Sequence, residues 1–153
     1  MILMRHGPCS EDYSKDPHLT DEGRFMVESL SFPSTLKIDI LISSSKKRAF
    51  QTARIIQAKF NKCKLVIDSD LREIAPATPK NSSFDTHPDY FRAQKVFRNI
   101  ILPNINNSKM FIVSHKNILS LFLQLAKKNG ITHMPDCDFD DFCSSVEIRG
   151  LPK

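Results

Sequence analysis

Short apolar runs alternate with longer stretches of helical periodicity along the chain. The opening run is continuous rather than alternating, which is typical of a strand covered on both faces in a mostly parallel sheet. The apolar runs predict strands at Ile2–Met4, Ile38–Ile42, Lys64–Asp68 and Met110–Val113, with a possible edge strand at Ser145–Ile148. Helical stretches between the strands predict an α/β fold, a three-layer α/β/α sandwich with a mainly parallel sheet. A length of 153 residues suits a single domain, residues 1–153.

Each helical stretch carries an apolar face and recognisable end signals. Thr20 is the expected N-cap of a helix that ends before Pro33, and the next helix spans Lys46–Phe60. Pro88 suits the first turn of a third helix, and Asn117 is the expected cap of a fourth that closes at Asn129-Gly130. The predicted buried residues are Phe25, Met26 and Leu30, with Val27 as a further candidate, then Ala49, Ala53, Ile56 and Phe60, and then Phe91, Val96, Phe97 and Ile100.

The charge balance favours an anionic partner. Lys and Arg number 22 against 17 Asp and Glu, which gives a net charge of +5 and a pI near 9.1. The basic residues are scattered apart from Lys46-Lys47-Arg48, and they do not interleave with aromatic residues as in single-strand binding grooves. We therefore expect a phosphorylated substrate rather than nucleic acid.

The cysteines and the hydropathy pattern indicate a cytoplasmic protein without a membrane span or a metal. Four cysteines are irregularly spaced and no secretory segment precedes them, so free thiols in a reducing compartment are expected. No apolar run is long enough to cross a bilayer. The cluster His133, Cys137 and Cys143 matches no standard zinc spacing, so we expect neither a metal site nor a cofactor.

Chemically capable residues follow the predicted strands. Arg5, His6 and Gly7 follow the first strand, and His115 follows the fourth. Because parallel sheets bind ligands at the carboxyl ends of their strands, these residues should converge at one edge. The second helix begins with three cations where the helix dipole is already positive, which an anion bound there would offset. The alternative is that these long side chains simply extend into water.

Five blocks in order resemble the histidine phosphatase superfamily, which has the phosphoglycerate mutase-like fold. They are Met4-Arg5-His6-Gly7, Leu19-Thr20-Asp21-Glu22-Gly23-Arg24, Ser44-Ser45-Lys46-Lys47-Arg48-Ala49-Phe50-Gln51-Thr52-Ala53, Leu71-Arg72-Glu73 and Val113-Ser114-His115. The resemblance implies a metal-independent phosphatase that hydrolyses phosphomonoesters through a phosphohistidine on His6. It also implies that Arg5, Arg48 and His115 surround the phosphoryl oxygens, with Gly7 beside them. Glu73 matches the family's usual proton donor.

Two features keep alternatives open. Lys116 follows His115 where the family commonly has glycine, and the chain is close in size to the short phosphohistidine phosphatase branch. That branch typically lacks the acid that Glu73 matches. The alternatives are therefore a protein phosphohistidine phosphatase, acting on a phosphoprotein instead of a small molecule, and a non-catalytic phosphate-binding module. The residues leave the physiological substrate and the oligomeric state open.

Overall fold

One mainly parallel sheet organises the molecule. The structure, a computed structural model, describes residues 1–12, 15–74, 88–131, 137 and 139–149. Within these ranges the strand order is β3-β2-β4-β1-β5. The strands are β1 (Ile2–Arg5), β2 (Ile40–Ser44), β3 (Lys64–Asp68), β4 (Met110–Ser114) and β5 (Ser145–Glu147). Strands β1 to β4 pair in parallel, and β5 adds antiparallel to β1 at the edge.

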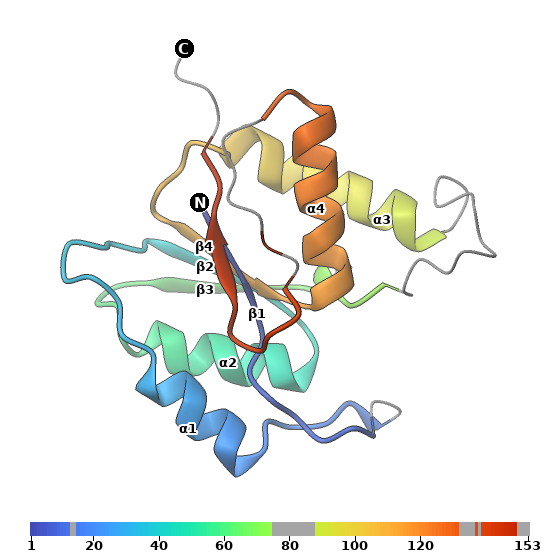
Figure 1. The fold of residues 1–153 in the computed structure, drawn as a ribbon. Helices are drawn as coiled ribbons and strands as arrows, with labels where there is room; N and C mark the ends of the chain where they lie inside the picture. The colour runs from blue at the N-terminus through green and yellow to red at the C-terminus, as the bar shows by residue number, and fades with distance from the viewer. Residues whose placement is uncertain (13–14, 75–87, 132–136, 138, 150–153) are drawn as a thin grey trace.

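Helices cover both faces of the sheet, which confirms the predicted α/β/α architecture (Figure 1). On one face lie α1 (Asp21–Ser29) and α2 (Lys47–Gln57). On the other lie α3 (Pro88–Val96) and α4 (Lys116–Lys128). A π-helical turn, Phe97–Ile101, and a 3-10 turn, Leu102–Asn104, continue α3. Another 3-10 turn, Ser69–Leu71, follows β3.

The sheet separates two hydrophobic clusters. Strand β4 is buried along its whole length, as its continuous apolar run predicts. Phe111 and Val113 belong to the cluster beneath α1 and α2, whereas Met110 and Ile112 belong to the cluster beneath α3 and α4. Ser114 is the last residue of β4, and His115 follows the strand.

The boundaries of β3 agree with prediction, and those of β2 do not. We expected β2 at Ile38–Ile42 and a serine turn after it, but the strand runs from Ile40 to Ser44. Ser43 and Ser44 are fully buried in it. Their hydroxyls have partners there, since Ser43 Oγ donates to the Ser44 carbonyl and Ser44 Oγ lies 2.8 Å from His115 Nε2. These contacts let two polar residues end a buried strand.

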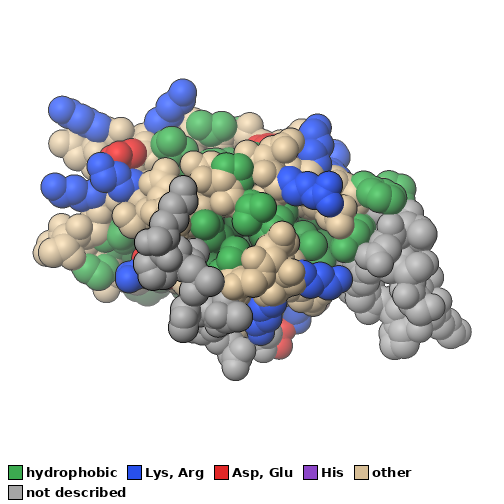
Figure 2. Space-filling model, turned by 90° about the horizontal axis from the view of Figure 1, so that it is seen from above, with side chains coloured by type: hydrophobic (Ala, Val, Ile, Leu, Met, Phe, Trp, Pro, Cys, Tyr) green, Lys and Arg blue, Asp and Glu red, His purple; other side chains and the backbone are tan. Residues whose placement is uncertain are grey.

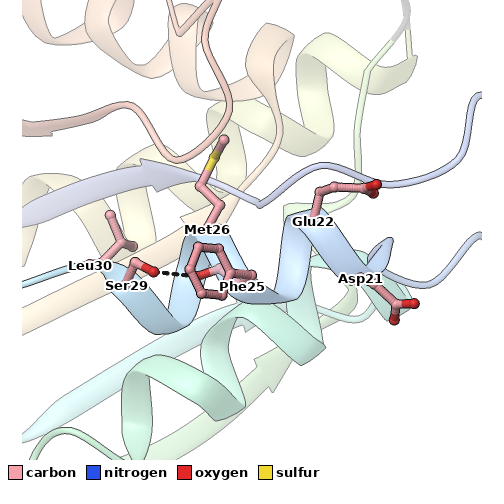
Figure 3. A pocket seen from close by; sticks show the side chains of 6 residues that line it. All are labelled: Asp21, Glu22, Phe25, Met26, Ser29 and Leu30. Atoms are coloured by element: carbon pink, nitrogen blue, oxygen red, sulfur yellow. Dashed lines mark hydrogen bonds between the residues drawn. The ribbon is translucent and has the colours of Figure 1, made fainter.

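The predicted buried face of α1 was wrong at two positions. Thr20 caps the helix as expected, accepting a hydrogen bond from the Gly23 amide. However, Phe25 is 72% and Met26 43% exposed, while Val27 is fully buried. Figure 3 shows Phe25 and Met26 among the residues that line an open hollow on α1. The helix instead packs through Gly23, whose missing side chain lets it approach Pro8 closely.

Two further sequence predictions fail in the second half. Phe91 is 58% exposed and Tyr90 and Ala93 are buried instead, whereas Val96 and Phe97 are buried as predicted. Asn117 lies inside α4 rather than at its N-cap position, which His115 occupies without a side-chain capping hydrogen bond.

Other predictions concern the surface and the thiols. All four cysteines are free. His133, which belongs to the cluster with Cys137 and Cys143, lies outside the described residues. On the face in Figure 2, Lys and Arg side chains are spread around the margin. Among the described helices, each is too short or too polar to cross a bilayer.

Candidate active site

The two histidines meet at the carboxyl edge of the central strands. His6 follows β1 and His115 follows β4, and these two strands are parallel neighbours. Their ring centroids are 5.0 Å apart. The structure therefore brings together the two residues that the strand ends predicted to converge.

Hydrogen bonds on both sides fix the tautomer of His6. Its Nδ1 lies 2.7 Å from the Gly7 carbonyl oxygen, which can only accept, so Nδ1 carries the proton. Its Nε2 accepts a hydrogen bond from Arg48 Nε at 3.1 Å, and a guanidinium can only donate. Nε2 consequently holds a lone pair. This is the state that a nucleophilic imidazole requires.

The surroundings also keep His6 uncharged. The side chain is 3% exposed. Burial lowers its pKa to about 3, and the nearby guanidinium groups of Arg48 and Arg5 act in the same direction. The hydrogen bond to Gly7 opposes this shift without reversing it.

His115 is fully buried and has one ring nitrogen without a partner. Its Nε2 lies 2.8 Å from Ser44 Oγ, at the end of β2. Its Nδ1 makes no hydrogen bond to any residue that the structure describes. Burial, followed by the proximity of His6 and Arg48, holds the pKa of His115 well below its usual range.

Arg48 connects the first turn of α2 to His6. It is buried, and its Nη1 lies 3.7 Å from Asp16 Oδ1. The same carboxylate accepts a hydrogen bond from the Lys47 amide at 3.2 Å. The structure thus supplies an internal anion at the cationic start of α2, where the sequence indicated a need for one.

Arg5 is held by the segment that precedes β5. Its Nη1 donates to the carbonyl oxygens of Phe139, at 3.0 Å, and Asp140. Its guanidinium carbon lies 4.1 Å from the centre of the Phe142 ring, a cation–π contact. Lys116, the residue in place of the family's glycine, pairs with the Asp140 carboxylate. Arg5 Nε is buried and has no hydrogen-bond partner within the described part of the chain.

Glu73 lies at the start of α4, beside the histidine edge. Its carboxylate accepts hydrogen bonds from the backbone amides of Asn117, at 3.3 Å, and Ile118, at 3.2 Å. Burial raises its pKa even though these amides, that of Ile74 and the charge of Arg48 oppose the shift. A raised pKa favours the protonated form, which is the form that a general acid needs.

Gly7 has a packing role in this arrangement. A Cβ there would lie 2.7 Å from Val27 Cγ2 and 3.2 Å from the Gly23 carbonyl oxygen, so only glycine allows α1 to come this close. Its amide donates to Thr52 Oγ1 at 3.0 Å. The structure therefore gives that amide a protein partner.

Sequence reasoning missed several residues around the edge. Asp16 and Phe142 come from loops, and Ser44 was assigned to a turn. For Ser44 the signal was its position at the end of a strand, and for Asp16 it was the unbalanced charge of the first turn of α2. Phe142 gave no sequence signal.

Comparison with known proteins identifies the family. A sequence model of the histidine phosphatase superfamily (branch 1) matches residues 1–91. That range is more than half of the 153 residues, and the chain belongs to this superfamily.

A curated relative and two solved structures are similar to the chain. Phosphoglycerate mutase-like protein 4 of Arabidopsis thaliana is 36% identical over 81 residues, which is 48% of this chain and 35% of the relative. The chain thus spans about a third of that relative's length. A mycobacterial glucosyl-3-phosphoglycerate phosphatase superposes with a TM-score of 0.60 at 16% identity, over 84% of this chain and 80% of that one. The protein histidine phosphatase SixA gives 0.55 at 19% identity, over 80% and 72%. At these identities the structural likeness concerns the fold.

Proposed function

We propose that the chain is a phosphatase that hydrolyses phosphomonoesters through a phosphohistidine on His6. The observation that carries the proposal is the state of His6: a neutral ring whose Nδ1–H is anchored on Gly7 and whose Nε2 keeps its lone pair beside Arg48. The unprotonated Nε2 accepts a hydrogen bond from a guanidinium, which can turn to a phosphoryl oxygen once substrate is bound and leave the lone pair to the phosphorus atom. Superfamily membership supports the same conclusion.

The reaction proceeds in two displacements. His6 Nε2 attacks the phosphorus atom, the P–O bond to the leaving group breaks, and Glu73 gives its proton to the departing oxygen. Water then attacks the phosphohistidine and the P–N bond breaks. The Glu73 carboxylate takes the proton from this water, and inorganic phosphate leaves with both groups restored.

Two unpartnered nitrogens support the proposed oxyanion site. Among the described residues, Arg5 Nε and His115 Nδ1 are the buried side-chain polar atoms without a hydrogen-bond partner. We propose that His115 carries its proton on Nδ1, with the Ser44 hydroxyl accepting from the Lys46 amide and donating to His115 Nε2. Both nitrogens are then donors, and phosphoryl oxygens are acceptors. Such donors stabilise the charge that builds up in phosphoryl transfer.

Phosphohistidine on a protein is the alternative substrate. The likeness of the fold to the protein histidine phosphatase SixA favours it. The raised pKa of Glu73 favours phosphomonoesters instead, because an alkoxide leaving group needs a proton in the transition state and an imidazole does not.

Trapping the intermediate tests the proposal. Brief incubation with a labelled phosphomonoester should yield a phosphoprotein that is labile in acid and stable in base, and His6→Ala should not form it. Full labelling of His6→Ala, or an acid-stable adduct, would refute the assignment. Phosphate binding without labelling or turnover would indicate the non-catalytic module.

A further inference from the structure

The segment that carries Glu73 is held by side chains from three other elements. All five carbonyl oxygens from Asp70 to Ile74 accept a hydrogen bond from a side chain. Asp70 and Leu71 lie in the 3-10 turn Ser69–Leu71, and the next three residues belong to no helix or strand. Carbonyl groups in such segments are often left to water. Here the backbone around Glu73 is fixed at every residue.

Arg92 of α3 makes most of these contacts. Its Nη1 donates to the carbonyl oxygens of Asp70, at 2.5 Å, and Arg72, at 2.9 Å. Its Nη2 donates to the carbonyl oxygen of Glu73 at 3.1 Å and to Asp89 Oδ1 at 3.0 Å. The Arg92 side chain is 14% exposed. The rigid fork of a guanidinium is what permits one side chain to hold three carbonyls at once.

Two residues near the histidine edge hold the other carbonyls. Ser114 Oγ, from the end of β4, donates to the Leu71 carbonyl at 2.6 Å. Asn117 Nδ2, from the first turn of α4, donates to the Ile74 carbonyl at 3.1 Å. These two residues flank His115, so the segment is tied to the histidine edge on one side and to α3 on the other.

We propose that Arg92 is a positioning residue that sets the location of the Glu73 carboxyl group for proton transfer. The inference rests on the proposed function, in which Glu73 is the general acid. A general acid must come within hydrogen-bond reach of the leaving oxygen, and a misplacement of about 1 Å can cost about 10²-fold in rate. Arg92 itself touches backbone and Asp89, so it acts on the chemistry only through Glu73.

Leaving-group dependence separates this role from a structural one. The measured quantity is the ratio of kcat/KM for an alkyl phosphate to kcat/KM for p-nitrophenyl phosphate, whose leaving group needs little protonation. Arg92→Ala should lower this ratio by about 10-fold to 10²-fold, because a displaced acid harms only the alkyl ester. Arg92→Lys keeps the charge but lacks the planar fork, so it should also lower the ratio. Retained turnover of p-nitrophenyl phosphate shows that each variant is folded.

A matched control lies on the same helix. Lys95 Nζ is 3.6 Å from Asp70 Oδ2, and its side chain is 68% exposed. Lys95→Gln removes a cation that contacts the carboxylate of Asp70 but none of the carbonyls, so the ratio should stay at the wild-type value.

A double variant tests whether Arg92 acts on the rate ratio through Glu73. In Glu73→Gln the ratio should already be low, and adding Arg92→Ala should lower it no further, because both changes remove the same proton transfer. An unchanged ratio in Arg92→Ala, together with a low ratio in Glu73→Gln, would overturn the positioning role and leave the proposed function standing. An additional loss in the double variant would show that Arg92 acts by another route. An unchanged ratio in Glu73→Gln would refute the acid role itself.

Discussion

The buried, neutral state of His6 predicts how the protein loses stability in acid. In the unfolded chain His6 titrates at its ordinary pKa of 6.5, whereas burial lowers the folded-state pKa to about 3. As the pH falls from 6.5 toward 3, the unfolded chain takes up a proton that the folded protein does not. His6 therefore adds no penalty above pH 6.5, and stability is lost progressively below it.

The size of the effect follows from the two pKa values. The full difference between 6.5 and about 3 corresponds to about 5 kcal/mol. Between about pH 7 and about pH 4.5 the contribution of His6 alone amounts to about 2.5 kcal/mol. His6→Asn keeps an amide that can donate to Gly7 but removes the titration, so this part of the loss should disappear.

Urea unfolding at the two pH values measures the difference. With an m-value of about 2 kcal/mol per molar, the wild-type midpoint should fall by about 1.2 M more than that of His6→Asn. His18→Asn, which makes the same substitution at an exposed histidine, is measured beside it. Equal losses in wild type and His6→Asn would mean that His6 is not held neutral, and the argument for its nucleophilic state would fail.

Four further substitutions test the site and its support. Arg5→Ala and Arg48→Ala should each weaken inhibition by vanadate by roughly 2–4 kcal/mol, and unchanged inhibition in both would place the anion elsewhere. Activity should resist EDTA, and dependence on an added divalent metal would contradict the mechanism. Gly23→Ala would put a Cβ 2.1 Å from the Pro8 carbonyl oxygen. It should destabilise the fold by about 1–3 kcal/mol, which a lower Tm would show. An unchanged Tm would mean that α1 does not pack against Pro8. Asp16→Asn removes the carboxylate that lies near Arg48 and competes with phosphate for it, so inhibition by inorganic phosphate should tighten about 2- to 5-fold. Weaker inhibition would mean that Asp16 instead orients Arg48.

The sequence predicts the sheet better than the helix faces, for a physical reason. A continuous apolar run such as Met110–Val113 has few alternatives to a buried strand, and β4 is found there. A helix face is harder to predict because pattern arguments favour large apolar residues. In α1 the contact is made by Gly23, where the absence of a side chain is what permits close approach. Phe25 and Met26 were therefore assigned to the wrong face.

The histidine edge was predictable because topology alone brings strand ends together. His6 and His115 follow parallel neighbours, so their proximity needs no detailed packing. Asp16 and Arg92 lie on a loop and on a helix, and no strand end determines their position. Their contacts depend on how loops and helices pack against the sheet, and local sequence patterns do not determine this packing.

The start of α4 shows where local and tertiary preferences diverge. Asn117 is a good local cap, yet the amides of Asn117 and Ile118 donate to Glu73, a residue more than forty positions earlier. This distant cap places two opposing influences on one carboxyl group: burial raises its pKa, and the helix amides lower it. For the proposed acid both are needed, because it must hold a proton before the first displacement and bear a charge between the two. Burial alone would make the charged state too costly, and the amides alone would make the proton too easily lost. The Asn117 side chain donates to the Ile74 carbonyl oxygen. The residue expected to cap the helix therefore helps to hold the segment of Glu73, whose carboxylate accepts hydrogen bonds from the helix amides.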